Sequence, residues 1–356
     1  VRIVEAFDSD GPALVEFFRS NPVGADSDFV LDRGPDFFAL LRLRGHFRTF
    51  CARSGERLLG VATALWHDGV DGDRQIRVGE VVDLRVAQTA RGSPVARALL
   101  ASVQRAFEEV GVHWYCATIG EANRAARRLV EGKAGLPALA PLDSYVSAHL
   151  LALRIPHAAG RGLSIRKVGL QDVAEVEARI AALRAPLRLR PATPFRWGTS
   201  GGEDRGWIAR NGAGDTVGLL VVWDGSEVRR IRVDRYSRGD ALLRTLTRLL
   251  APTGLVNPLP PPGGALRLWA SRALWNRDGT PAVSRALVVA ALAAAARAGA
   301  HVVQVNSRSD DPVVGHLRRF PGSSFRSRLF GRPGDPSRPE PPARDAGPFY
   351  TELALV

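Results

Sequence analysis

The chain has 356 residues, 45% of them hydrophobic, and a formal net charge of +13. This length predicts about two domains of roughly 100–200 residues each, and the hydrophobic content excludes a chain that is disordered throughout. No apolar run reaches the ~18 residues that span a bilayer, and the first residues, VRIVEAFDSD, lack the apolar region of a signal peptide. With only two isolated cysteines, Cys51 and Cys116, we expect a cytoplasmic protein without disulfides.

The positive charge comes almost entirely from arginine, because Lys133 and Lys167 are the only lysines. A basic surface favours anionic partners such as nucleic acid, a phosphorylated cofactor or an acidic membrane. The same abundance of arginine, alanine and glycine is also typical of a GC-rich genome. The charge therefore admits several partner classes and selects none.

Hydrophobic periodicity in the first half predicts an alternation of strands and helices. We predict strands at 1–5, 47–53, 57–68, 76–86, 112–118 and 144–153, and helices at 10–20, 94–110 and 121–132. In the helix at 94–110, the apolar residues Val95, Leu99 and Val103 recur at a spacing of four. One face of that helix is therefore expected to be buried.

The second half repeats the same order. Strands are predicted at 163–169, 206–212, 216–225, 227–236, 265–274, 301–307, 324–330 and 349–356, and helices at 170–183, 239–250, 281–298 and 311–320. The segment RIPHAAGRG at 154–162 is typical of a linker. We therefore predict an α/β (α+β) chain of two domains, 1–155 and 162–356, the second with an insertion at 237–264, and each a mixed, largely antiparallel sheet flanked by helices.

The stretch VVDLRVAQTARGSPVARALL at 81–100 predicts a strand, a short loop and a helix. A helix N-terminus presents free N–H groups and a partial positive charge, and so can hold an anion. Proline suits the first helical position, which makes Ser93 the expected N-cap. Pro94 removes one donor, but Gly92, Ser93, Val95 and Ala96 still offer theirs.

These features resemble the GCN5-related N-acetyltransferase (GNAT) superfamily. In that family the pyrophosphate loop is written Q/R-x-x-G-x-G/A; Arg91 and Ala96 match it, and Pro94 stands where glycine is usual. The downstream stretch NRAARRLV resembles a second family element through Asn123, with Val130 where a tyrosine commonly protonates the leaving thiolate. The resemblance covers about 1–153, and 162–356 resembles a divergent second copy.

The resemblance implies an acyl-CoA-dependent N-acyltransferase with acetyl-CoA as co-substrate and no metal. It places the cofactor against Arg91, Gly92, Ser93, Val95, Ala96 and Asn123, with the strand backbone at Leu84, Arg85 and Val86 beside the pantetheine arm. Glu80 is the expected general base, because a strand carboxylate near an apolar core can take a proton from an ammonium. Tyr145, with Tyr115 as an alternative, is the candidate for the missing general acid.

Two other functions remain open from the sequence. Tandem GNAT-like domains also occur in Fem-type transferases, which use aminoacyl-tRNA, and the charge of +13 suits such a partner. A non-catalytic acyl-CoA-binding scaffold would explain both Pro94 and Val130. We rank acyl transfer to a small-molecule amine or a peptide first, because the arginines form no continuous run. Like-charge repulsion disfavours polycationic acceptors, and we expect no membrane partner.

Other motifs give weaker indications of function. The stretch GTSGG around Ser200 matches a serine nucleophile pattern, but that pattern requires a helix afterwards and a strand is predicted instead. The seven histidines are scattered without the spacing of metal ligands. We therefore expect neither serine chemistry nor a metal site.

Overall fold

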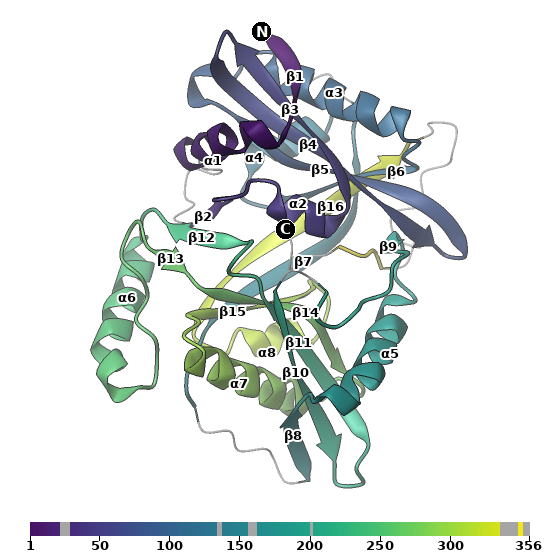
Figure 1. Cartoon of the computed structure of the whole chain (residues 1–356). Helices are drawn as coiled ribbons and strands as arrows, with labels where there is room; N and C mark the ends of the chain where they lie inside the picture. The colour runs from purple at the N-terminus through teal and green to yellow at the C-terminus, as the bar shows by residue number, and fades with distance from the viewer. Residues whose placement is uncertain (22–28, 134–136, 156–161, 200–201, 335–347, 352–356) are drawn as a thin grey trace.

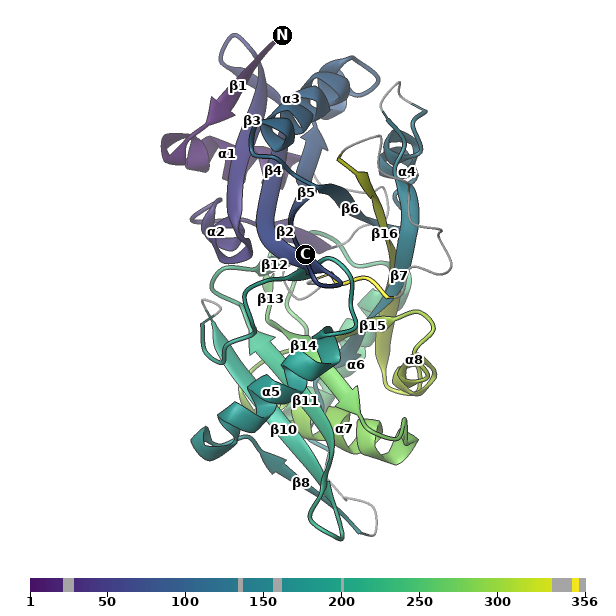
Figure 2. The same ribbon diagram turned by 90° about the vertical axis from the view of Figure 1, so that its right-hand side faces the viewer.

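The computed structural model describes residues 1–21, 29–133, 137–155, 162–199, 202–334 and 348–351. Its two halves lie end to end, with the N-terminal half at the top of Figures 1 and 2. A single large sheet of 13 strands runs through both halves. Ser200 and most of the predicted linker lie outside the described residues.

The N-terminal half follows the predicted order closely. Its elements are β1 (Arg2–Ala6), α1 (Gly11–Ser20), β2 (Phe29–Asp32), α2 (Ala39–Arg44), β3 (His46–Ser54), β4 (Arg57–Asp71), β5 (Arg74–Val86), α3 (Val95–Glu109), β6 (Trp114–Gly120), α4 (Arg124–Val130) and β7 (Ala140–Leu151). Val95, Leu99 and Val103 of α3 are buried in the N-terminal core, as their spacing predicts. Short 3-10 turns at Asp8–Asp10 and Gln88–Ala90 precede α1 and α3.

The C-terminal half repeats that plan. Its elements are β8 (Leu163–Lys167), α5 (Val173–Arg184), β9 (Arg190–Pro191), β10 (Glu203–Asn211), β11 (Thr216–Asp224), β12 (Arg230–Val233), α6 (Arg238–Leu250), β13 (Ala265–Leu266), β14 (Leu268–Asn276), α7 (Pro281–Arg297), β15 (Val302–Arg308), α8 (Val313–Leu317) and β16 (Gly322–Pro333). The alanine-rich α7 packs its buried residues into the core of this half. Of the strand predicted at 349–356, residues 352–356 lie outside the described residues, and Phe349 forms a bridge with Arg188.

The strand order shows that the two halves exchange their closing strands. Along the sheet the order is β1-β3-β4-β5-β6-β16-β7-β15-β14-β11-β10-β8, and the thirteenth strand, β9, pairs with β4 off this path. Thus β16, from the end of the chain, pairs with β6 of the N-terminal half, while β7 pairs with β15 of the C-terminal half. We expected 144–153 to close the first half, but it lies in the second. The parallel pairs β5–β6 and β14–β15, each joined through a helix, occupy equivalent positions in the two halves.

A second, small sheet also joins the halves. Its order is β13-β12-β2, so that β2 of the N-terminal half pairs along β12 of the C-terminal half. The strand predicted at 227–236 therefore lies outside the main sheet: β11 pairs with β14, and β12, α6 and β13 form an excursion between them. Beside this sheet, Leu40 of α2 packs against Trp223 of β11. The loop between β2 and α2 is consequently held by both halves.

Candidate active site

Strands β5 and β6 separate after a short stretch of pairing. They pair in parallel only from Val78 to Glu80, against Trp114–Cys116, whereas β5 continues to Val86 and β6 to Gly120. Beyond Glu80, the edge of β5 that faces β6 has no strand partner among the described residues. A wedge therefore opens between two adjacent strands, with Glu80 at its closed end.

A bulge in β5 accompanies this separation. The pairing between β4 and β5 shifts register between Val61 and Thr63, and Asp83 has a φ of 57°, in the left-handed region that non-glycine residues rarely adopt. Such a bulge re-aims side chains and bends the strand. Here it accompanies the contact of the Asp83 carboxylate with Arg33, at 2.5 Å between Oδ1 and Nη2.

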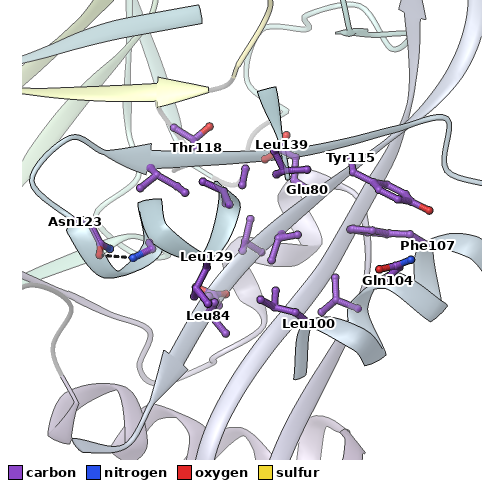
Figure 3. A pocket seen from close by; sticks show the side chains of 18 of the residues that line it. Glu80, Leu84, Leu100, Gln104, Phe107, Tyr115, Thr118, Asn123, Leu129 and Leu139 are labelled. Carbon is purple, nitrogen blue, oxygen red and sulfur yellow. Dashed lines mark hydrogen bonds between the residues drawn. The ribbon is translucent and has the colours of Figure 1, made fainter. Parts of the chain in front are cut away.

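The wedge opens into a cavity of about 370 Å³. Figure 3 shows Leu84, Leu100 and Leu129, from β5, α3 and α4, gathered around it, with Tyr115, Phe107 and Gln104 at one end and Asn123 at the other. The remaining apolar lining includes Val81, Val82, Val103, Ala117, Ile119, Ala126 and Leu139. The charged lining residues are Arg33, Arg44, Glu80, Asp83 and Arg332.

Glu80 and Arg44 reach the cavity from the face of the sheet opposite α3, whereas Arg332 lies over the Tyr115 ring on the side of α3. A Cβ added at Gly79 would meet the Phe107 ring of α3 at 2.9 Å, so position 79 faces α3. Since neighbouring strand residues point to opposite faces, Glu80 points away from α3. There Arg44, the last residue of α2, donates from Nη2 to Glu80 Oε2 at 2.5 Å. The cavity therefore passes through the sheet at the wedge.

The predicted phosphate loop is exposed next to this cavity. The stretch Arg91–Pro94 is solvent-exposed, and Gly92 has a φ of +81° with open space where a Cβ would lie. The helix begins one residue later than predicted: Pro94 is the N-cap residue, while the Ser93 hydroxyl donates to the Ala90 carbonyl at 2.6 Å. The Ser93 amide donates to the Ala90 carbonyl at 3.3 Å and the Val95 amide to the Ser93 hydroxyl at 3.4 Å, whereas the amides of Ala96 and Arg97 have no carbonyl acceptor within the helix. The loop thus keeps only part of its predicted donors for an anion, and Arg91, Gly92, Ser93, Val95 and Ala96 do not line the cavity itself.

Of the other predicted cofactor contacts, two line the cavity and two do not. Leu84 and Asn123 line the cavity, and the Asn123 side chain caps α4 by accepting from the Ala126 amide at 3.1 Å. Arg85 and Val86 do not line it. The Arg85 guanidinium instead stacks on the Phe18 ring at 3.9 Å, where burial lowers its pKa to about 10.

Of the two tyrosines considered as the general acid, one lines the cavity and the other does not. Tyr145 lies outside the cavity, in a buried cluster with Trp114 and Phe349, and its hydroxyl donates to the Phe349 carbonyl at 2.6 Å. We therefore do not retain Tyr145 as the general acid. Tyr115 does line the cavity, stacked against Phe107 at 5.4 Å between ring centroids. Burial raises the pKa of the Tyr115 phenol, so the group is protonated near neutral pH.

The equivalent wedge in the C-terminal half is bridged by side chains. Strands β14 and β15 also pair over only a short stretch, Leu268–Ala270 with Val302–Gln304. Beyond it, the Asn306 amide donates to the Ser271 hydroxyl at 2.8 Å, and the Asn306 side chain donates to the Ser271 carbonyl at 3.3 Å. In the C-terminal half, hydrogen bonds thus join the two strands at the point where the strands of the N-terminal half separate.

Residues 13–135, which contain the splayed strands, the loop and α4, match the acetyltransferase (GNAT) family. The N-terminal domain is a GNAT domain. This confirms the resemblance deduced from Arg91, Ala96 and Asn123.

Solved structures extend the fold to the whole chain. A tandem GNAT protein from the clavulanic acid biosynthesis pathway has a TM-score of 0.58 at 14% identity, covering 95% of this chain and 99% of that one. Saccharomyces cerevisiae N-myristoyltransferase with bound myristoyl-CoA and inhibitors has a TM-score of 0.58 at 11% identity, covering 93% and 79%. The tandem GNAT fold is confirmed. Among curated protein sequences, none matches this chain significantly.

Two further observations bear on the expected partners. In the described ranges, no helix is long and apolar enough to cross a membrane. Among the same residues, no three His, Cys, Asp or Glu side chains gather in a way that could hold a metal ion.

Proposed function

We propose that this protein is an acyl-CoA-dependent N-acyltransferase that transfers an acetyl group to an amine. The observation that carries the proposal is the cavity at the β5–β6 wedge, apolar on the side of α3 and α4 and closed by the Glu80 carboxylate on the other. The pantetheine arm would lie along the unpaired edge of β5. Its phosphates would reach the exposed loop at Gly92, since Leu100 lies only about 8 Å along α3 from the start of the helix.

The reaction follows from this arrangement. An acceptor ammonium entering on the α2 face loses a proton to Glu80, directly or through one water. The free amine attacks the thioester carbonyl, a C–N bond forms and the C–S bond breaks, and the CoA thiolate leaves and takes up the proton that the nitrogen releases. An unpaired amide of β5 polarises the carbonyl oxygen. The ion pair with Arg44 fixes the position of the Glu80 carboxylate.

Cofactor binding is tested at Gly92 with two variants of nearly equal size. Asn and Asp both tolerate the left-handed backbone of Gly92, but only Asp adds a negative charge where the phosphates would bind. Calorimetric titration should give similar acetyl-CoA affinity for Gly92→Asn and wild type, and at least about 10-fold weaker binding for Gly92→Asp. Equal acetyl-CoA affinities for both variants would show that the phosphates do not bind at this loop.

The acyl group is tested with a chain-length series. Acetyl-, butyryl- and octanoyl-CoA are compared in kcat/KM for one amine, with CoA thiol release as the readout. We expect acetyl-CoA to be preferred. A higher kcat/KM for octanoyl-CoA would overturn the acetyl assignment and leave acyl transfer standing. The apolar lining around Leu100 and Leu129 makes this comparison informative.

A further inference from the structure

The buried side chain of Arg33 carries N–H groups that the described residues do not satisfy. Its side chain is 3% exposed and lines the cavity. Nη2 donates to Asp83, but the buried Nε and Nη1 atoms have no hydrogen-bond partner among the described residues. A buried donor without an acceptor costs about 1–3 kcal/mol, and more when it is charged. Arg33 therefore offers two free donor groups at the edge of a cavity.

Among the described residues, positive charge exceeds negative charge around Arg33. The guanidinium groups of Arg33, Arg44 and Arg85, here called the arginine cluster, lie near the two carboxylates of Glu80 and Asp83. Burial, together with the nearby charges of Arg33 and Arg44, lowers the pKa of Arg229 to about 10. The carboxylates thus leave part of the cluster's charge uncompensated.

The two nearby histidines do not alter this balance. Burial lowers the pKa of His67, which lies near Glu80 and Arg44. Burial and the charge of Arg229 lower the pKa of His149 to about 4. Both imidazoles are therefore neutral at pH 7, and the local excess remains positive.

The free donors of Arg33 lie on the acceptor side of the cavity. Arg33, Arg44 and Leu31 come from the segment that β12 and Trp223 hold against the sheet, whereas the phosphate loop lies at the N-terminus of α3. Arg33 is therefore separate from the groups expected to bind CoA phosphates. An anion at Arg33 must come from the reacting parts of the substrates.

We propose that Arg33 binds a carboxylate carried by the acceptor, so that the acceptors are amines with a nearby carboxylate group, such as amino acids. A carboxylate is planar and binds one edge of a guanidinium, so it can accept from either Nε or Nη1 of Arg33. It would satisfy one of these unpaired donors and offset the excess charge of the arginine cluster. This inference rests on the proposed acyl transfer, and it names the substrate class.

The test compares acceptors that differ only in charge. The common amino acids and their carboxamides are assayed in pairs with acetyl-CoA, through CoA thiol release. We expect kcat/KM to be at least about 10-fold higher for the acids, the usual contribution of a charge-assisted hydrogen bond. Equal values for acid and amide in the wild-type protein would overturn the proposal.

Two variants connect that preference to Arg33. The double variant R33Q/D83N removes both charges of the ion pair and leaves no single buried charge behind. It should lose the preference while retaining acetyl-CoA affinity. Arg53→Gln is the control: this arginine pairs with Asp10 at 2.8 Å and does not line the cavity. It should keep the preference. A preference that persists in R33Q/D83N would contradict the assignment to Arg33.

A carboxylate could also belong to the acyl donor. Succinyl-CoA and butyryl-CoA have acyl chains of equal length, and only succinyl-CoA ends in a carboxylate. With carboxamide acceptors, a preference for succinyl-CoA that R33Q/D83N abolishes would overturn the acceptor assignment and move the carboxylate to the donor. Equal rates for the two thioesters would support the acceptor assignment.

A binding measurement separates failure of this inference from failure of the proposed function. Thermal unfolding is followed without CoA, with each amino acid or its carboxamide added. A rise in Tm with acids alone, absent in R33Q/D83N, supports the carboxylate site even if no acetyl transfer occurs. Acetyl transfer with equal rates and equal Tm shifts for acids and amides would overturn the inference and leave the proposed function standing.

Discussion

Glu80 lies where the acceptor and the thioester are expected to meet, and its side chain is 16% exposed and paired with Arg44. The isosteric change Glu80→Gln removes the proton acceptor. We expect kcat to fall by about 10²–10⁴, the usual contribution of a general base, with acetyl-CoA affinity unchanged. Steady-state kinetics and calorimetric titration measure the two quantities. A kcat within a factor of about three of the wild-type value would assign the proton transfer to another group.

Tyr145 gives a prediction of the opposite kind. Its hydroxyl is bonded to the Phe349 carbonyl inside a buried cluster, so Tyr145→Phe should cost about 1–2 kcal/mol of unfolding free energy and leave kcat unchanged. Tyr115→Phe, in the cavity wall, is the comparison. Denaturant unfolding and kinetics on both variants separate the roles. A large loss of kcat in Tyr145→Phe alone would restore Tyr145 as a catalytic residue.

His149 links stability to pH. Burial, and then the charge of Arg229, lower its folded-state pKa to about 4, below the value of about 6.5 in an unfolded chain. As the pH falls from about 6.5 towards 4, the unfolded state gains a proton that the folded state does not, and the protein loses stability. His149→Gln should therefore show a smaller drop in Tm between pH 7.5 and pH 4.5. An equal drop in both proteins would contradict this.

At the level of elements, β16 comes from the C-terminal half but forms part of the wall of the cavity in the N-terminal half. Phe330 of β16 is 4% exposed and packs against Ala117 and Ile119 of β6, both of which line the cavity. Phe330→Ala should cost about 3–5 kcal/mol in urea unfolding and weaken acetyl-CoA binding. Phe325→Ala on the same strand, where the ring is 45% exposed, should cost less than about 1 kcal/mol. Similar costs for both would show that β16 does not support the cavity.

The sequence predicts the elements with strong local periodicity and misses those set by distant partners. The strand–loop–helix at 76–110 follows from its apolar spacing and from Gly92 and Pro94. By contrast, β2 and α2 span only four and six residues, too few for a periodic signal. The exchange of β7 and β16 is invisible locally, because either strand has the alternation to close either half.

The residues of the candidate site were likewise only partly predictable from the sequence. Glu80 and the phosphate loop are recognisable because their spacing along one stretch of chain is fixed. Arg33 was missed because its importance depends on Asp83, 50 residues further along the chain. Tyr145 was placed in the site because a phenol on a neighbouring strand is plausible, whereas its actual partner, Phe349, is 204 residues away. Pairings at such distances are properties of the folded sheet.

For the whole molecule, the strand exchange predicts one cooperative unit. Each half lacks the closing strand that the other provides. Calorimetry should show a single unfolding transition, and the separate fragments 1–155 and 162–356 should not fold, because β6 and β15 would each lose a neighbour. A sharp thermal transition in either fragment alone would show that the halves are independent domains.

The position of β16 near the end of the chain also has a consequence during synthesis. Strand β6 ends at Gly120, but β16, which pairs with one of its two edges, begins only at Gly322. At translation rates of about 5–20 residues per second, the ribosome needs on the order of 10–40 s to make the intervening chain. Throughout that interval β6 presents an unpaired edge, the feature of nascent proteins that recruits other strands and leads to aggregation. Production of this protein should therefore depend on chaperones that shield nascent chains.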